Sequence, residues 1–333
     1  MNKLTFLSCD WGTTAFRLRL VDAACKIIEE EKTALGIAET FQQWKNTGKN
    51  EEARLPFYLN IIDQQIKTIE KKINTSLQHV PLIISGMASS TIGMVDLPYK
   101  NCPFNIDGSD LQVEKIEVSD KFKHDVSIIS GVRTEDDVMR GEETKLIGCF
   151  AAVSNENDHV FIFPGTHPKH VNVKDGKATG FKTYMTGEIF DLLSKKSVLS
   201  VSVEKDEDFE KRSHFLAFEK GVNDSTDLNI LHACFLVRTN NIFNKLTKQE
   251  NYYYLSGLLI GTELKDLRNS AFTNITIAGN EAITPYYTKA LHILGLPKLN
   301  GLLQTQHADE ALIRGQLKIL GKLGEVKICR LLL

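Results

Sequence analysis

The chain has 333 residues, of which 42% are hydrophobic and 25% are charged, and its formal net charge is −2. This length exceeds the size at which one hydrophobic core keeps growing, so two domains are expected. The small negative charge argues against a nucleic-acid partner, and no apolar run approaches the roughly 20 residues that span a bilayer. Six scattered cysteines without a C-x-x-C pair predict a cytoplasmic protein with neither a zinc site nor a disulfide framework.

The first half of the chain alternates short apolar runs with helical patterns. Apolar runs predict strands over residues 3–9, 16–21, 80–85 and 125–131. Apolar side chains at helical spacing predict helices over 57–73 and 139–152. The Gly-, Ser- and Pro-rich segment 86–110 reads as an extended loop, and loops of this length are often functional. This order of elements is typical of an α/β protein.

The second half repeats this alternation. Residues 158–191 have strand–turn–strand patterning, and the charged tract 198–213 is an irregular connection. Helices are then predicted over 253–264, 283–294 and 309–321, with a strand over 275–279 before the second of them. Gly295 stands where a helix commonly ends in a left-handed residue.

A repeat links the two halves. The stretch "LSCDWGTTAFRLRLVD" (7–22) and the stretch "VFIFPGTHPKHVNVKD" (160–175) align at an offset of 165 − 12 = 153 residues. Gly165 then falls on Gly12 and Thr166 on Thr13, so each half contains an early strand–Gly-Thr–strand hairpin.

Such a hairpin is either a simple bend or a phosphate site. Glycine permits a close backbone approach, and consecutive N–H groups with a threonine hydroxyl form a concavity that binds anions. Only the first copy carries a carboxylate, because Asp10 aligns with Phe163. Asp10 is therefore the candidate ligand for a magnesium ion held against phosphates. We expect the two hairpins to hold one triphosphate from opposite sides.

Seven segments carry a family resemblance over nearly the whole chain. They are "DWGTT" (10–14), "GMASSTIG" (86–93), "VMRGEETKLIG" (138–148), "PGTHPKHV" (164–171), "YMTGEIFDLL" (184–193), "LSGLLIGTEL" (255–264) and "DEALIRG" (309–315). Together they resemble the 2-dehydro-3-deoxygalactonokinase family, within the hexokinase–actin–chaperone ATPase superfamily. Met94 departs from the pattern, because the family typically has a tryptophan there.

The resemblance implies an α/β fold of two ribonuclease-H-like domains, of the actin and hexokinase type, flanking a nucleotide cleft. The first domain would span residues 1–155 and be completed by the C-terminal segment 309–333. The second would span 156–308. The implied activity is ATP-dependent, magnesium-assisted phosphorylation of the 6-hydroxyl of 2-dehydro-3-deoxy-D-galactonate. The partner is thus a small sugar acid, with no membrane and no nucleic acid, and a homodimer is possible.

The resemblance also implies the residues that bind the cofactor. The first phosphate motif falls on Asp10, Gly12, Thr13 and Thr14, the second on Gly165, Thr166 and His167, and the adenosine side on Gly279 and Asn280.

The catalytic base is left open among four acids. Glu143 lies on the apolar stripe of the helix predicted over 139–152, where a carboxylate is costly unless it is paired or used. Glu142 flanks it, and Asp136 and Asp137 precede the helix, where related kinases carry their catalytic aspartate. Arg140 either pairs with one of these acids or grips the substrate carboxylate or the γ-phosphate, because its planar fork suits both anions.

Small polar residues predict the sugar pocket. The candidates in the extended loop are Ser85, Gly86, Met87, Ser89, Ser90 and Gly93. A second group of candidates stands at the start of a predicted helix, namely Thr186, Gly187 and Glu188. Either their N–H groups contact a ligand, or these residues only cap the helix.

Two other functions stay open from the sequence. The chain is either a kinase for another sugar or 2-keto-3-deoxy sugar acid, or a non-catalytic nucleotide-binding regulator on the same scaffold. The "GMASSTIG" segment (86–93), which we call the sugar loop, and the "MRGEET" segment favour a kinase over a regulator.

Overall fold

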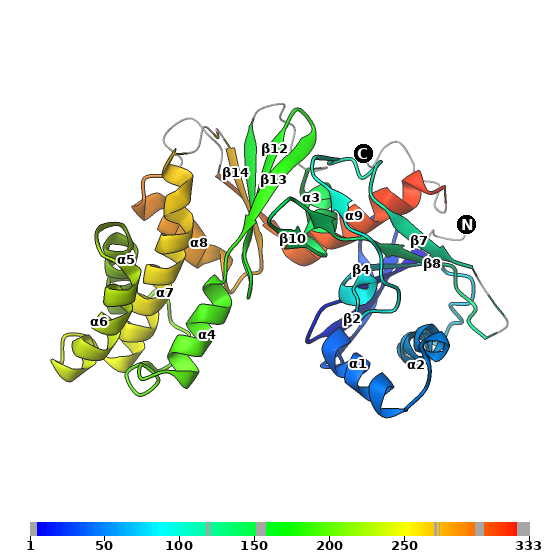
Figure 1. Cartoon of the computed structure of the whole chain (residues 1–333), viewed down its shortest axis with the longest axis horizontal. Coiled ribbons are helices and arrows are strands. Elements are labelled where there is room, and N and C mark those ends of the chain that lie inside the picture. The colour runs from blue at the N-terminus through cyan, green and yellow to red at the C-terminus, as the bar shows by residue number, and fades with distance from the viewer. Residues whose placement is uncertain are drawn as a thin grey trace. The chain divides into compact units, whose positions relative to one another are not determined.

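The computed structural model describes residues 5–117, 119, 121–150, 158–269, 272, 274–296 and 303–324 (Figure 1). The chain divides into two compact units. Unit 1 comprises residues 1–155, 176–180 and 308–333, and unit 2 comprises 156–175 and 181–307. The segment 176–180, which we expected in the second domain, thus belongs to unit 1. Parts of three predictions lie outside the described residues, namely 3–4, 151–152 and 325–333.

Unit 1 is built on a six-stranded sheet with the order β3-β2-β1-β4-β8-β7. Its strands are β1 (Thr5–Trp11), β2 (Phe16–Asp22), β3 (Ile27–Thr33), β4 (Leu82–Gly86), β7 (Val113–Ile116) and β8 (Val126–Ile129). The first three strands pair antiparallel, whereas β1, β4 and β8 run parallel. The carboxyl ends of β1 and β4 therefore lie side by side.

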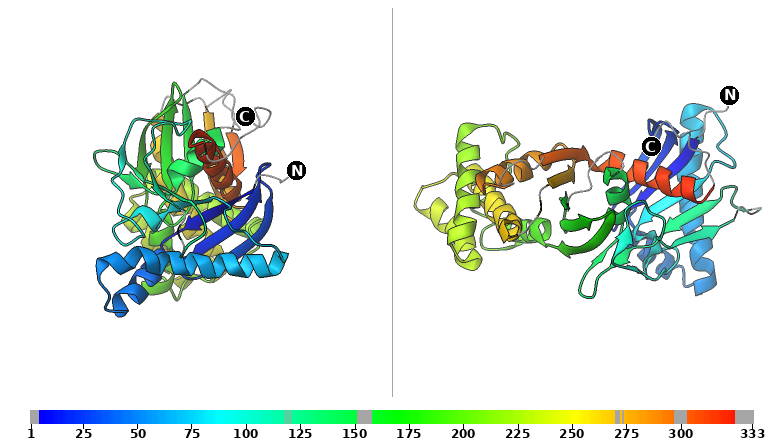
Figure 2. Two further views of the ribbon diagram at one scale, coloured as in Figure 1. Left: turned by 90° about the vertical axis from the view of Figure 1, so that its right-hand side faces the viewer. Right: turned by 90° about the horizontal axis from the view of Figure 1, so that it is seen from above.

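Helices cover both faces of this sheet (Figure 2). One face packs on α2 (Arg54–Ile73), with α1 (Ile37–Asn46) and the short turn η1 (Glu51–Ala53) beside it. The other packs on α3 (Glu142–Phe150) and α9 (Ala308–Lys322). Side chains of a strand alternate between its faces. Cys9 and Trp11 point to the α2 face, so Asp10 lies on the face of α3 and α9.

Unit 2 repeats this strand order. Its sheet runs β15-β14-β11-β12-β13, with β11 (His159–Phe163), β12 (Lys169–Lys174), β13 (Lys177–Thr183), β14 (Asn274–Gly279) and β15 (Leu303–His307). Again the first strand pairs antiparallel with the second and parallel with β14. An α/β fold with two ribonuclease-H-like sheets is confirmed.

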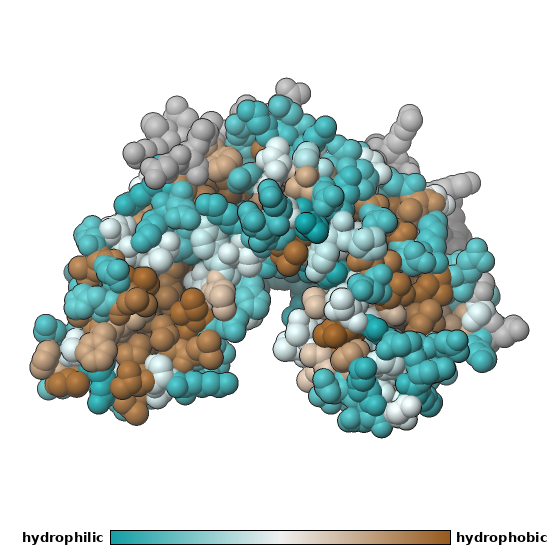
Figure 3. Space-filling model, in the orientation of Figure 1, coloured by the Kyte–Doolittle hydropathy of each residue, from teal (hydrophilic) through white to brown (hydrophobic). Residues whose placement is uncertain are grey.

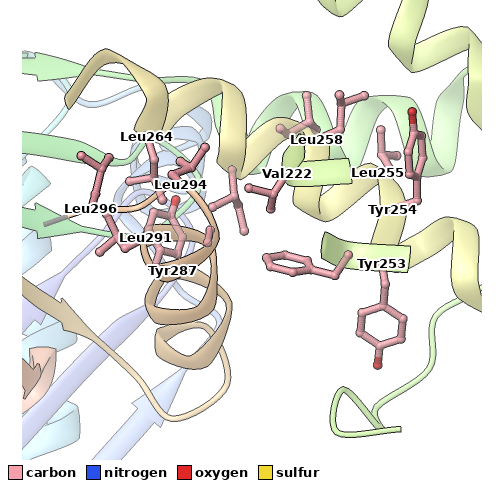
Figure 4. Packing of buried hydrophobic residues seen from close by; sticks show 14 of the residues in the cluster. Val222, Tyr253, Tyr254, Leu255, Leu258, Leu264, Tyr287, Leu291, Leu294 and Leu296 are labelled. Atoms are coloured by element: carbon pink, nitrogen blue, oxygen red, sulfur yellow. The ribbon is translucent and has the colours of Figure 1, made fainter. Parts of the chain in front are cut away.

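The helices of unit 2 form one side of its core. They are α4 (Thr186–Lys196), α5 (Arg212–Asp227), α6 (Ile230–Ile242), α7 (Lys248–Leu264) and α8 (Thr284–Ile293), with the turn η3 (Lys265–Asn269). Figure 4 shows Val222 of α5 beside Leu258 of α7, and Tyr287 and Leu291 of α8 grouped with Leu264. Fully buried tyrosines thus supply much of this core.

Five short elements also belong to unit 1. They are η2 (Met87–Ser89), β5 (Lys100–Asn101), β6 (Phe104–Asn105), β9 (Val132–Arg133) and β10 (Val138–Met139). Three of them, β10, β9 and β5, form a small sheet in that order. The predicted helix over 139–152 therefore starts three residues late, at Glu142, because Met139 pairs with Val132 in the β10–β9 ladder. Strands β3 and β15 and helix α1 were not predicted.

The two hairpins differ in register by one residue. The turn between β1 and β2 is closed by the pair Trp11–Phe16, and that between β11 and β12 by the pair Phe163–Lys169. Pro164 stands at the counterpart of Trp11 and has no N–H to donate to a partner strand. The repeat therefore aligns the strands but not their pairing.

Large apolar side chains are exposed on α4, on α6 and on the turn between α4 and α5. They are Met185, Ile189, Leu192, Val198, Val201, Leu231, Phe235, Ile242 and Phe243. Figure 3 shows apolar side chains gathered over this part of unit 2. None of the helices described is both long and apolar enough to cross a bilayer.

Two glycines let α3 and α9 approach closely. A Cβ atom on Gly148 of α3 would lie 1.8 Å from the Ala311 carbonyl oxygen, and one on Gly315 of α9 would lie 1.9 Å from the Thr144 carbonyl oxygen. These contacts are with backbone, which cannot rotate away. The docking of α9 on α3 therefore depends on both glycines.

We predict that Gly148→Ala or Gly315→Ala lowers the free energy of unfolding of unit 1 by about 1–3 kcal/mol, the usual range for overpacking a core. Thermal unfolding followed by circular dichroism measures the change as a lower Tm. Gly180→Ala in β13 is the control, because a Cβ there meets no atom within 4 Å. Equal Tm values for Gly148→Ala and Gly180→Ala would contradict the prediction.

Candidate functional site

Asp10 lies at the carboxyl end of β1, next to the start of the sugar loop. It pairs with Ser85 across the β1–β4 ladder, and Trp11 pairs with Gly86. Gly86 has a φ of +91°, and a Cβ there would lie 2.8 Å from the Trp11 carbonyl oxygen. Only glycine fits this conformation without strain. The adjacent strand ends therefore bring the first phosphate motif and the sugar loop together within unit 1.

The turn after β1 is held by the start of α1. The Gly12 N–H donates to the Ala15 carbonyl at 2.9 Å, and the N–H of Ile37 donates to the Gly12 carbonyl, also at 2.9 Å. Thr13 and Thr14 are exposed at the tip. The predicted phosphate residues thus form a fixed turn with two accessible hydroxyl-bearing side chains.

Cations surround the Asp10 carboxylate. Arg17 lies 3.5 Å from Asp10 and 3.4 Å from Asp309 of α9. The buried Arg19 binds the other oxygen of Asp309 at 2.8 Å. Asp10 keeps 17% of its side chain exposed, so it remains accessible to a ligand.

Lys145 of α3 belongs to the same cluster, and sequence reasoning missed it. Partial burial lowers the pKa of Lys145, but the negative charges of Asp10, Glu142, Asp309 and Glu143 outweigh that effect and raise the pKa above its ordinary value. An ammonium surrounded by four carboxylates stays charged at neutral pH. The sequence offered one indication of this role: Lys145 follows Glu142 by three residues, a spacing that puts both on the same face of a helix.

Glu142 and Glu143 open α3 in different environments. Glu143 is 1% exposed, and both its oxygens accept from the Gly141 N–H, at 2.9 and 2.7 Å. Burial, together with the neighbouring charge of Glu142, raises the pKa of Glu143 to about 7. Glu142 is half-buried and accepts from the Arg140 N–H at 3.2 Å. Only Glu142 of this pair presents its carboxylate to solvent.

Arg140 is held over an aromatic ring. Its guanidinium carbon lies 4.2 Å from the centre of the Tyr99 ring, and its Nη1 donates to the Ser89 hydroxyl at 2.6 Å and to the Ser89 carbonyl. Its Nε is buried and makes no hydrogen bond to any residue that the structure describes. A planar donor held in this way is suited to an anionic ligand.

Hydrogen bonds within the sugar loop and from α2 hold this loop in place. The Ser90 hydroxyl donates to the Met87 carbonyl at 2.7 Å, and Arg54 of α2 donates to the Gly93 carbonyl at 2.7 Å. Ser89 and Ser90 are buried. These hydroxyls therefore support the loop, and direct contact of Gly86, Met87, Ser89, Ser90 and Gly93 with a substrate stays a prediction.

The remaining acid candidates lie in a turn between β9 and β10. Asp136 and Asp137 line a hollow of about 350 Å³ together with Tyr99 and Arg133. Asp137 accepts from the Val138 N–H at 2.8 Å. Neither of these aspartates is among the charges that act on Lys145.

The second hairpin lies against the start of α4. A Cβ on Gly187 would lie 2.4 Å from the Gly165 carbonyl oxygen. His167 contacts Glu188 at 2.6 Å, and the Glu188 N–H donates to the Thr166 carbonyl at 3.1 Å. Glu188, which we predicted to bind the sugar, is thus placed beside the predicted phosphate residues of unit 2.

A pocket of about 730 Å³ borders this hairpin. Gly165, Thr186, Gly187 and Asn280 line it, together with side chains of α7, α8 and the acidic segment 205–210. Gly279 ends β14 beside Pro164, because a Cβ on Gly279 would lie 3.6 Å from the proline ring. Asn280 accepts from the N–H groups of Ala282 and Ile283 at 3.1 and 3.0 Å before α8 begins. The predicted adenosine-side residues therefore adjoin a pocket of suitable size for a nucleoside.

The surroundings of Asp10 in unit 1 fit a magnesium ion that is bound to the phosphates of a nucleotide. No group of three His, Cys, Asp or Glu among the described residues is placed to hold a metal. Magnesium in phosphoryl-transfer sites needs only one or two carboxylates, since phosphates and waters supply the other ligands. The accessible carboxylate of Asp10 meets that requirement.

Comparison with known proteins identifies the family of the chain. The chain is 28% identical over 318 residues to a protein of Rhizobium meliloti (strain 1021) named as a probable 2-dehydro-3-deoxygalactonokinase, covering 93% of this chain and 94% of that protein. It is 28% identical over 297 residues to the 2-dehydro-3-deoxygalactonokinase of Escherichia coli (strain K12), covering 87% and 90%. A crystal structure from Sinorhizobium meliloti that carries the same enzyme name superimposes with a TM-score of 0.78 at 25% identity, over 96% of this chain and 100% of that one. The model of the 2-keto-3-deoxy-galactonokinase family matches residues 10–319, and the chain belongs to that family.

Proposed function

We propose that the chain transfers the γ-phosphoryl group of ATP to the 6-hydroxyl of 2-dehydro-3-deoxy-D-galactonate. The observation that carries this proposal is the convergence, at one sheet edge of unit 1, of an accessible carboxylate at Asp10, the fastened sugar loop and the start of α3. Membership of the family, whose named relatives are kinases for this sugar acid, supports the substrate. A cytoplasmic location and a homodimer stay predictions.

Nucleotide binding is assigned to residues of both units. ATP supplies the phosphoryl group, and magnesium supplies neutralisation of the phosphate charge. Asp10 would hold the magnesium ion, and Gly12, Thr13 and Thr14 would donate to phosphate oxygens. In unit 2, Gly165, Thr166 and His167 would do the same, while Gly279 and Asn280 border the pocket that takes the nucleoside. We assign Thr186 and Glu188 to this nucleotide side, because they contact or adjoin the second hairpin.

Arg140 and Lys145 are assigned to anion binding in unit 1. Arg140 would grip the substrate carboxylate with its planar fork, since its ring stacking and its bonds to Ser89 fix its orientation. Lys145 would stabilise the charge that builds up on the transferred phosphoryl group. Arg140 is held in place before any ligand arrives, which reduces the reorganisation that the reaction requires.

Glu142 is the base that the geometry favours. A base must come within hydrogen-bond reach of the hydroxyl that it deprotonates, and Glu143 is 1% exposed with both oxygens on the Gly141 N–H. A carboxylate oxygen of Glu142 would accept the proton of the 6-hydroxyl. Asp136 and Asp137 are the alternatives, in the turn that precedes β10.

We predict ADP release with 2-dehydro-3-deoxy-D-galactonate in a coupled assay, and at least about 100-fold less release after Asp10→Asn, because the variant loses the charge that holds magnesium. Asp22→Asn is the matched control. Asp22 ends β2 and accepts from the N–H groups of Ala24 and Lys26 at 2.9 and 3.0 Å, away from the strand ends that form the site.

A panel of hexoses and other 2-keto-3-deoxy sugar acids in the same assay separates the substrate alternatives. Faster turnover of any of these would replace the proposed substrate. ADP binding without turnover of any sugar would favour the regulator.

We predict that Glu142→Gln lowers kcat by about 100-fold to 10,000-fold, the usual contribution of a positioned base. Glu143→Gln should keep kcat within about tenfold of the wild type, since a buried carboxyl with no access to substrate contributes only through structure. Steady-state kinetics of both variants at pH 7.5 test the assignment. A large loss for Glu143→Gln with none for Glu142→Gln would reverse the two roles.

We predict that Arg140→Lys raises KM for the sugar acid by about tenfold or more and leaves KM for ATP unchanged, because lysine cannot keep both the bonds of Nη1 to Ser89 and a second donor, Nη2, for the carboxylate. The methyl ester of the substrate is the control ligand, since it lacks the carboxylate charge. Arg140→Lys should alter its KM little. Equal effects on acid and ester would show that Arg140 serves the loop instead of the carboxylate.

A further inference from the structure

Glu263 is a buried acid of α7 that the mechanism above does not use. It is 2% exposed and accepts three hydrogen bonds. The donors are Nε2 of His170 at 2.8 Å, the hydroxyl of Thr186 at 2.5 Å and the phenol of Tyr287 at 2.8 Å. One carboxylate therefore joins three other elements of unit 2, namely β12, α4 and α8.

Two of these three elements, α4 and α8, line the pocket beside the second hairpin, and the third follows that hairpin in the chain. Strand β12 begins at Lys169, directly after the turn that contains Gly165. Thr186 is the first residue of α4 and lines the pocket, and Tyr287 lines it from α8. The carboxylate of Glu263, which itself lines a separate pocket, thus joins two walls of this pocket to the strand that follows the hairpin.

The contact between α4 and the hairpin is tight, so small displacements of α4 matter. A Cβ on Gly187 would lie 2.4 Å from the Gly165 carbonyl oxygen, and Lys169 donates to the His167 carbonyl at 2.9 Å. Thr186 is the neighbour of Gly187 and is held by Glu263. A change in the Thr186–Glu263 distance would therefore be transmitted to the hairpin backbone.

A carboxylate is an expensive choice for a purely structural contact here. Burying an acid costs free energy unless hydrogen bonds satisfy it, and the surroundings on α7 are apolar, with Leu259, Ile260 and Leu264 buried. Hydrogen bonds to a charged acceptor are short and directional. They fix three elements at defined distances, which apolar packing alone does more loosely.

We propose that Glu263 is a positioning residue of the nucleotide site, which presets the second hairpin, the start of α4 and α8 for the nucleotide. The inference rests on the proposed function, in which this pocket takes ATP. Preorganisation of this kind raises affinity by removing the cost of ordering the site on binding. Glu263 does not line the pocket assigned to the nucleotide, so it would act on nucleotide affinity only through the elements that it joins.

The test is Glu263→Gln, which keeps the size of the side chain but replaces one acceptor oxygen by a donor. The amide oxygen can still accept from Thr186 and Tyr287, but the charge on the acceptor is lost, and the amide N–H faces His170 Nε2, which must then change from donor to acceptor. We expect the Kd for ADP, measured by titration calorimetry, and KM for ATP both to rise about tenfold. KM for the sugar acid should stay within about twofold of the wild type.

Asn251→Ala on the same helix is the matched control. Asn251 is fully buried, and its amide donates to the carbonyls of Ser202 and Val237 at 3.1 and 3.0 Å. Asn251 thus links α7 to α6 and to the segment between α4 and α5, and it does not line the pocket. Asn251→Ala should lower Tm while leaving the Kd for ADP at the wild-type value.

A double-mutant cycle with Tyr287→Phe separates positioning from direct contact. If the phenol acts through Glu263, the loss of ADP affinity in the double variant will be smaller than the product of the two single losses. Should Glu263→Gln fail to fold, Tyr287→Phe, which removes one donor only, carries the test through the same Kd and KM values.

An unchanged Kd for ADP in Glu263→Gln, with a Tm lowered as in Asn251→Ala, would overturn the inference and leave the proposed function intact. Equal rises in KM for ATP and for the sugar acid would overturn it too, since they indicate general damage. A wild-type protein that binds no ADP would overturn the proposed function itself and, with it, this role of Glu263.

Discussion

The site of unit 1 depends on the parallel pairing of β1 with β4. This pairing sets Asp10 opposite Ser85 and leaves Gly86 directly beside the last residues of β1. Because side chains alternate across a sheet, a shift of one residue would turn Asp10 to the face covered by α2, toward Tyr58, and would turn Trp11 out of that core. Its contacts with Arg17 and its proximity to Lys145 require the register that is observed.

Charge in this cluster is balanced by more than one cation. Asp10, Glu142, Glu143 and Asp309 all act on Lys145, and Arg17 and Arg19 bind Asp309 at 3.4 and 2.8 Å. Asp309 belongs to α9, which reaches this face because Gly148 and Gly315 let α9 approach α3. The C-terminal helix therefore contributes charge to a site whose other residues come from the first half of the chain.

The local pattern of the sequence was sufficient to locate inner strands of both sheets and both Gly-Thr turns. Alternating and continuous apolar runs located β1, β2, β4 and β14 to within a few residues, and the repeat at an offset of 153 identified both Gly-Thr turns. The edge strands β3 and β15 were not predicted, because their sequences "IIEEEKT" and "LQTQH" lack the apolar pattern of a buried strand. The difference in register between the two hairpins was not predicted either, because a sequence alignment does not show which residues pair across the strands.

Side chains that act across elements were harder to predict than those within a motif. Lys145 lies inside a recognised segment, but its relation to Asp10 depends on which sheet face α3 covers. In the sequence, Glu263 stands out in the same way as Glu143, as an acid on an otherwise apolar face of a helix. In Glu143 that acid is satisfied by the Gly141 N–H and the Thr144 hydroxyl, both from its own turn.

The difference between these two buried acids follows from the reach of their donors. Both contacts of Glu143 come from within two residues of it, so they shape the start of α3 and leave the rest of unit 1 to packing. The donors of Glu263 come from residues 93, 77 and 24 positions away. A carboxylate that accepts from such distant donors constrains the tertiary arrangement of unit 2, and two of those donors line the pocket beside the second hairpin.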